Sequence, residues 1–213
     1  QIQHRHADNA EQRGRFLLEA EITGCLEHPG VVPVYSLGQD ADGRPFYAMR
    51  FIRGDSLAEA VKDFHQKDRF VGRAGERVLE LRKLLGRLVD VCNAIAYAHS
   101  RGVLHRDLKP GNIMLGKYGE TLVVDWGLAK ATGRSDPQST SDERVVQPSS
   151  GDSSTPTVMG SALGTPQYMS PEQAEGRLDL LGPQTDVYGL GATLYCLLTG
   201  VAPFQGEHKE EIL

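Results

Sequence analysis

Four polar residues flank a pair of apolar segments in the middle of the chain: Asp107, Lys109, Asn112 and Asp125. Residues 113–115 and 121–124 are apolar or β-branched, and residues 116–119 between them contain two glycines, which is typical of a turn. The two segments are therefore predicted to pair as an antiparallel hairpin. Because antiparallel strands return the chain to its starting end, we expect the four polar side chains to gather at one edge of the hairpin.

Two carboxylates, an amide and an ammonium group in one place suit a site for Mg²⁺ and a phosphate group. Mg²⁺ prefers hard oxygen ligands, and it is usually bound by one or two carboxylates together with the phosphates of a substrate. The residue types around the hairpin therefore predict a magnesium–phosphate site.

The elements that must position this site follow from hydrophobic spacing and from glycine and proline. We expect a helix from about residue 10 that His28-Pro29-Gly30 stops, and a short helix over residues 56–66. Apolar residues then recur every three or four positions from 79 to 100, which predicts a long amphipathic helix. A last helix is expected from Gln184 until Gly200 and Pro203 end it.

Two further strands are expected at residues 31–37 and 46–52, around a turn at 40–43. A segment rich in serine, threonine, proline, glutamine and aspartate runs from about 132 to 157, and its composition cannot support a packed core. It is either an inserted, mobile loop or a disordered linker, and the linker is the preferred interpretation for residues 134–154.

Bulk properties exclude some function classes. The 213 residues carry a formal net charge of −5, which argues against a general binder of nucleic acid or anionic membranes. The longest apolar run, at 187–198, is interrupted by glycines and is too short to span a bilayer. Cys25, Cys92 and Cys196 are scattered and lack C-x-x-C spacing, so we expect buried free thiols in a cytoplasmic protein.

Three motifs carry a resemblance to a known family: H-R-D-L-K-P-G-N at 105–112, D-W-G at 125–127 and G-T-P-Q-Y-M-S-P-E at 164–172. Together they resemble the signature set of protein kinases, and more closely that of bacterial serine/threonine kinases of the eukaryotic-like type. The resemblance implies an α+β, two-lobe protein kinase-like fold, here truncated. Residues 1–52 would be the remainder of the N-terminal lobe, and residues 53–213 an incomplete C-terminal lobe with an activation segment at 125–172.

The resemblance also assigns Glu19 to the helix whose glutamate orients a phosphate-binding lysine. A plain exposed helix carboxylate is the alternative. The lysine would then fall at or just before residue 1, and no G-x-G-x-x-G pattern occurs in the sequence. We therefore expect a fragment that begins after the lysine and is inactive by itself.

An ATP site follows from the same resemblance. Met49 would be the gatekeeper, although an ordinary core methionine is equally compatible with its position. Residues 50–52, with Phe51 at their centre, would form the hinge whose backbone binds adenine, and Met114 would pack under the adenine ring. Arg50 departs from the acidic residue common in the family, but backbone hydrogen bonds need no particular side chain.

For catalysis, the resemblance implies that Asp107 orients the acceptor hydroxyl and takes its proton, while Lys109 stands beside the γ-phosphate. Asn112 and Asp125 would hold Mg²⁺. The hydroxyl of Thr165 would bridge Asp107 and Lys109.

Three supporting roles are implied as well. Asp186 would hold the backbone of the H-R-D loop, a role compatible with simple capping of its own helix, and His105 would pack beneath Trp126. Arg106 suggests control by a phosphorylated activation loop, with Thr157 or Ser161 as the candidate sites, Thr155 as a weaker one, and a kinase dimer as a possible source of the phosphate.

The predicted function is a serine/threonine protein kinase that transfers the γ-phosphate of ATP to protein hydroxyls. A pseudokinase or scaffold without catalysis is the alternative. A small-molecule kinase is disfavoured by residues 164–172, which resemble a peptide-docking loop. We expect no nucleic-acid partner and no membrane segment, and any membrane anchor would lie outside these residues.

Overall fold

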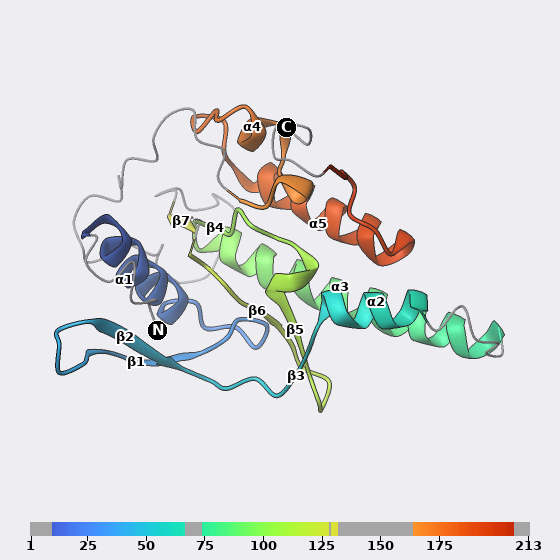
Figure 1. Ribbon diagram of the computed structural model, residues 1–213, viewed down its shortest axis with the longest axis horizontal. Helices are drawn as coiled ribbons and strands as arrows, with labels where there is room; N and C mark the ends of the chain where they lie inside the picture. Colours follow the sequence, from blue (N-terminus) through green and yellow to red (C-terminus); the bar gives the residue numbers. More distant parts are fainter. Residues whose placement is uncertain (1–9, 67–73, 128, 132–163, 207–213) are drawn as a thin grey trace.

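The computed structural model describes residues 10–66, 74–127, 129–131 and 164–206. Figure 1 shows helix α1 (Ala10–Gly24) and strands β1 (Val34–Gln39) and β2 (Pro45–Met49) grouped on one side, with the longer helices on the other. Strands β1 and β2 pair antiparallel as predicted, but β1 begins three residues later than the expected 31–37 and β2 ends three residues earlier than the expected 46–52. None of the helices within these ranges is both long and apolar enough to cross a membrane.

The second group of elements surrounds helix α3 (Ala74–Ser100). Helix α2 (Leu57–Gln66) precedes it, and α5 (Pro183–Thr199) packs against both. The face of α3 that carries Leu84, Leu88, Val91 and Ile95 is buried in one apolar core with residues of α2 and α5. Burial of side chains of this size contributes roughly 1.5–3 kcal/mol each, so this core fixes the helices that support the site.

The predicted central hairpin is present. Strand β5 (Ile113–Gly116) pairs antiparallel with β6 (Thr121–Val123), and β3 (Gly54–Ser56) adds to the other edge of β5. The turn is closed by the Gly116 N–H, which donates to the Glu120 carbonyl at 2.8 Å. A second small sheet joins β4 (Val103–Leu104) to β7 (Lys130–Ala131), on either side of the hairpin in sequence.

The remaining elements are short: the 3-10 helices η2 (Pro110–Asn112) and η3 (Pro166–Tyr168), and α4 (Pro171–Ala174). Helix α2 begins after Ser56, whose N–H and hydroxyl both donate to the Glu59 carboxylate in a capping box. Helix α5 ends at Gly200, which has a φ of +79° and therefore the left-handed conformation that favours glycine.

Three expectations need correction. Helix α3 begins at Ala74 rather than Leu79, since 74–78 contain no proline and Glu76 suits the positive end of the helix dipole. Helix α1 ends at Gly24, before His28. Glycine has low helix propensity, and residues 25–31 form turns that are closed by local backbone hydrogen bonds. Cys25 and Cys92 are exposed, so of the three thiols only that of Cys196 is buried.

Candidate active site

Two residues beside the central hairpin have unusual backbone conformations. Among the described residues, Arg106 with φ +68° and Asp125 with φ +64° are the non-glycine residues in the left-handed region. That conformation costs an L-residue about 1–2 kcal/mol, so surrounding contacts must hold both turns in place. Arg106 immediately precedes Asp107. Asp125 follows the second strand of the hairpin, with only Val124 between them.

Asp186, buried in the first turn of α5, supplies one of these contacts. Its carboxylate accepts the backbone N–H of Arg106 at 2.7 Å and that of His105 at 2.9 Å, and it also contacts His99 Nε2 at 2.8 Å. Burial would raise the pKa of Asp186, but these hydrogen bonds outweigh it and lower the pKa. The predicted anchoring of the loop is confirmed. Asp186 does not also cap its helix, because the cap position is Gly182.

His105 connects the two left-handed turns. Its Nδ1 accepts the Asp107 N–H at 3.2 Å, which leaves Nε2 to donate to the Val124 carbonyl at 3.2 Å. The imidazole is fully buried and packs on Trp126, as the family resemblance implies, with ring centroids 4.7 Å apart. This burial lowers the pKa of His105. The neutral ring therefore bridges the residue before Asp125 and the backbone of Asp107.

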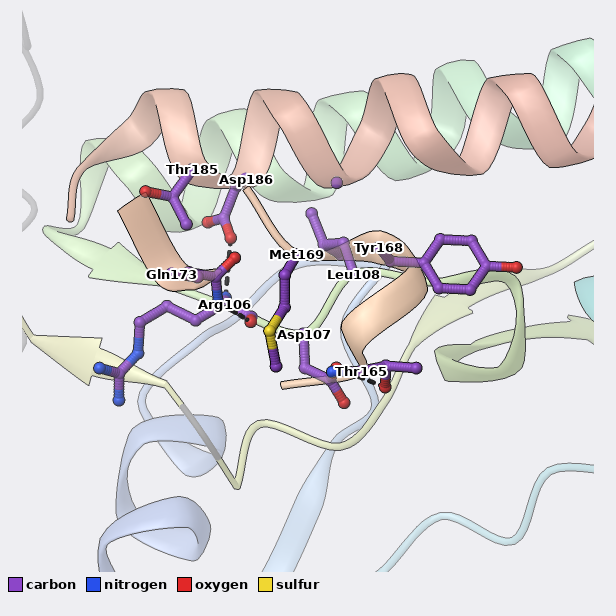
Figure 2. Close-up of a pocket in the computed structure, with 10 residues that line it drawn as sticks. Arg106, Asp107, Leu108, Thr165, Tyr168, Met169, Gln173, Thr185 and Asp186 are labelled. Atoms are coloured by element: carbon purple, nitrogen blue, oxygen red, sulfur yellow. Dashed lines mark hydrogen bonds between the residues drawn. The ribbon is translucent and has the colours of Figure 1, made fainter. Parts of the chain in front are cut away.

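The Asp107 carboxylate is surrounded by donors. Lys109 Nζ donates to Oδ2 at 2.6 Å, and the Thr165 N–H and hydroxyl donate to Oδ1 at 3.0 and 2.9 Å. Lys109 Nζ also contacts the Thr165 hydroxyl at 2.6 Å. The predicted bridge by Thr165 is thus present, although 58 positions separate Thr165 from Asp107. Figure 2 shows Thr165 and Asp107 side by side.

Asn112 and Asp125, the predicted magnesium ligands, lie on neighbouring chain segments. Asn112 Nδ2 donates to the Asp107 backbone oxygen at 2.9 Å and to its carboxylate at 3.1 Å. Both bonds use the amide nitrogen, so the side-chain oxygen is the atom left to face a cation. The Val124 N–H donates to the Asn112 carbonyl at 3.0 Å, which brings the next residue, Asp125, to the same edge of the hairpin. Two hard oxygen donors at one edge fit Mg²⁺.

Glu19 projects from α1 towards the same region. A methyl group built on Gly127 would lie 3.2 Å from a Glu19 carboxylate oxygen and 3.3 Å from one of Asp125, so both carboxylates border this glycine. The Tyr47 hydroxyl donates to Glu19 at 2.9 Å. Burial and the Asp125 charge raise the pKa of Glu19, although the Tyr47 hydrogen bond opposes them. The alternative of a plain exposed carboxylate does not describe Glu19.

The predicted adenine residues are less enclosed. Met49 is 37 % exposed and Phe51 82 % exposed, so Met49 is not the core methionine of the alternative interpretation. Met114 is half-buried on β5, where it pairs with Ser56 and Leu122. A cavity of about 270 Å³ lies between residues 50–53 and the β5–β6 turn, but neither Met49 nor Met114 lines it. Adenine binding by these residues stays a prediction.

Sequence reasoning missed two residues of this site. Gln173 on α4 donates from Nε2 to the Arg106 carbonyl at 2.7 Å, and Tyr47 holds Glu19. A signal existed for Gln173, since Ser170 followed by a glutamine three positions later is the pattern of a capping box, and Gln173 Oε1 does accept the Ser170 N–H at 3.2 Å. No comparable local pattern marks Tyr47. The predicted phosphorylation sites Thr155, Thr157 and Ser161, and the segment 134–154, lie outside the described residues.

A family model and several curated proteins match this chain. A family model described as the protein kinase domain matches residues 1–213. The chain is 40 % identical over 209 residues to "Serine/threonine-protein kinase PknD" of Protochlamydia amoebophila, which covers 93 % of this chain and 20 % of that protein. It is 40 % identical over 203 residues to the protein of that name from Chlamydia muridarum, covering 93 % and 21 %.

A third relative, "Serine/threonine-protein kinase PknD" of Chlamydia pneumoniae, is 38 % identical over 210 residues, covering 97 % of this chain and 22 % of that protein. The chain thus spans about a fifth of the length of the curated relatives it matches. The α+β architecture, the three motifs and these matches together place the chain in the protein kinase domain family, among the bacterial serine/threonine kinases of the eukaryotic-like type.

Proposed function

We propose that this chain forms the catalytic part of a protein kinase that transfers the γ-phosphate of ATP to serine or threonine hydroxyls of proteins. The observation that carries the proposal is the set of donors around the Asp107 carboxylate: Lys109, Asn112 and Thr165. Phosphoryl transfer depends on positioning and on charge neutralisation more than on covalent chemistry. A fixed carboxylate with an adjacent ammonium group suits both needs.

In this proposal Asp107 orients the acceptor hydroxyl and accepts its proton. The Asp107 side chain is 9 % exposed and that of Lys109 is 25 % exposed, so an entering hydroxyl meets the carboxylate at a partly covered edge. Lys109 is near enough to turn its ammonium group from Asp107 towards a transferring phosphate. Thr165 fixes the two side chains relative to each other, because its hydroxyl contacts each of them.

Asn112 and Asp125 would hold Mg²⁺, and the ion would neutralise phosphate charge. Glu19 borders Gly127 together with Asp125, where it would orient a phosphate-binding lysine. Met49, Phe51 and Met114 would surround the adenine ring. These roles rest on the motif resemblance and on the position of each residue around the hairpin.

Protein hydroxyls are the proposed acceptors because residues 164–172 lie directly against Asp107. The Thr165 N–H and hydroxyl both donate to Asp107, and η3 and α4 continue from that point. A peptide held by this segment would present its hydroxyl to the catalytic carboxylate. The same contact disfavours a kinase of small molecules, for which a docking segment at this place has no role.

The pseudokinase alternative is tested with the longest natural protein that contains these residues. Asp107→Asn removes the base while keeping side-chain size, and Asp63→Asn, an exposed aspartate on α2, is the matched control. We expect phosphate transfer to a protein substrate to require Mg²⁺ and to fall at least about a hundredfold in the Asp107 variant only. ATP binding by the wild type without any transfer would instead identify a scaffold.

We further propose that the protein acts in the cytoplasm, where ATP is available.

We also propose that Thr157 or Ser161 is phosphorylated by a second copy of the kinase. Arg106 lies next to Asp107, and a phosphate group brings about −1.5 to −2 charges that such an arginine can bind. Mass spectrometry of the active full-length protein tests this directly. A fully active protein with an unmodified segment would contradict it.

A further inference from the structure

Gln173 links the segment 164–172 to the catalytic loop by both ends of its amide. The side chain is buried, with 6 % exposed. Its Oε1 accepts the Ser170 N–H at 3.2 Å and the Ser170 hydroxyl at 3.3 Å, while its Nε2 donates to the Arg106 carbonyl at 2.7 Å. Figure 2 shows Gln173 beside Arg106, with the hydrogen bond drawn.

The Arg106 residue is consequently held on two sides. Asp186 from α5 accepts its N–H at 2.7 Å, and Gln173 from α4 donates to its carbonyl. Arg106 has the left-handed φ of +68°, and its carbonyl belongs to the peptide bond that leads into Asp107. A residue in this conformation keeps it only when its surroundings determine it from several directions.

Gly164 provides the space for this contact. It has a φ of +123°, and a methyl group built on it would lie 3.3 Å from the Arg106 carbonyl oxygen and 3.5 Å from Gln173 Nε2. The turn at Gly164 therefore brings the docking segment close enough for Gln173 to reach the catalytic loop, and a larger side chain would crowd both atoms.

We propose that Gln173 is a positioning residue for the reaction. It fixes the peptide bond between Arg106 and Asp107, so the catalytic carboxylate is correctly oriented only when the segment 164–172 packs against the catalytic loop. The inference deepens the proposed function and rests on it. Residues placed even about 1 Å away from their productive position can lose much of their rate contribution. Gln173 would act on turnover through Arg106 and would leave ATP affinity unchanged.

Gln173→Met tests the proposal, because methionine has similar length and no strong donor or acceptor. Gln184→Met is the matched control, since Gln184 Nε2 also donates to a backbone carbonyl at 2.7 Å, that of Leu180, but lies on the exposed surface. Both are made in the full-length kinase and are compared by kcat, by KM for ATP and by thermal unfolding. We expect kcat of the Gln173 variant to fall about tenfold, equal to about 1.4 kcal/mol, with KM for ATP within twofold.

A Gln173→Met variant with kcat within twofold of the Gln184 variant would overturn the inference. If Gln173→Met does not fold, Gln173→Glu decides in its place. It keeps an acceptor for Ser170 but puts an oxygen where the donor to Arg106 was, so the same fall in kcat supports the inference and an unchanged kcat overturns it. A wild type without Asp107-dependent transfer would instead refute the proposed function, which separates the two failures.

Discussion

Acidification should weaken the fold through His105. The imidazole is fully buried and accepts the Asp107 N–H through Nδ1, so a second ring proton would remove that acceptor and leave a buried charge. Burial therefore lowers the pKa of His105 from its ordinary value of 6.5. In the unfolded chain the ring takes up a proton near pH 6.5, whereas in the folded protein it does so only at lower pH.

The sign and size follow from proton linkage. Between pH 6.5 and the folded pKa the unfolded state binds more protons, so the stabilising contribution is complete above about pH 6.5 and is lost as the pH falls. One such group changes the free energy of unfolding by at most about 1.4 kcal/mol per pH unit. Between pH 7.5 and 5.5 the loss from His105 is therefore at most about 1.4 kcal/mol, because half of that interval lies above its unfolded pKa.

Urea unfolding at pH 5.5, 6.5 and 7.5 measures this effect. The sequence has a single tryptophan, and it is Trp126, whose ring packs on His105, so its fluorescence reports unfolding of this region. His105→Phe should lower stability at pH 7.5 and lose less stability on acidification than the wild type. Ile113→Val, a buried change that costs roughly 0.5–1.5 kcal/mol, should keep the wild-type pH dependence. Equal pH dependence in wild type and His105→Phe would refute the reasoning.

Three further outcomes are expected. Asp186→Asn should lower the free energy of unfolding by about 1.5–3 kcal/mol in urea titrations, because its amide must turn a donor towards one of the three groups that now donate to the carboxylate. Thr165→Val should lower kcat about tenfold or more while Thr165→Ser stays near wild type, since the Thr165 hydroxyl contacts both Asp107 and Lys109 and serine keeps it. Gly54→Ala should lower the free energy of unfolding by about 1–3 kcal/mol, because the new methyl group would overlap the Leu115 carbonyl. By contrast, Gly86→Ala on the open face of α3 should raise the free energy of unfolding by about 0.5–1 kcal/mol. Thermal unfolding distinguishes the two glycine variants.

Much of the site could be predicted from sequence because its parts are local. The hairpin and its turn are encoded by two apolar or β-branched runs around a glycine-containing turn within residues 113–124, and the polar residues at its ends follow directly in the sequence. The contacts of Thr165 and Asp186 with the loop were also expected, but only through the family resemblance, since composition and spacing carry no information about partners 58 to 81 positions away.

The missed features are those decided by packing between distant segments. Gln173 reaches a residue 67 positions earlier, and Tyr47 reaches Glu19 across 28 positions. Cys25 and Cys92 lie in helical or near-helical patterns, yet which face of a helix is covered depends on the neighbours that the fold supplies, and both are exposed. The early start of α3 reflects the weak contrast between a charged connection and a charged first helical turn.

The electrostatics around Gly127 connect the fold to the proposed chemistry. Glu19 and Asp125 both border this glycine, and burial, together with the Asp125 charge, raises the pKa of Glu19. A carboxyl group with a raised folded pKa contributes more stability below its unfolded pKa and loses that contribution as the pH rises, so at neutral pH the charged Glu19 carboxylate opposes folding. A nearby cation would offset this repulsion, which is an electrostatic reason for the proposed roles of Asp125 at Mg²⁺ and of Glu19 beside a phosphate-binding lysine.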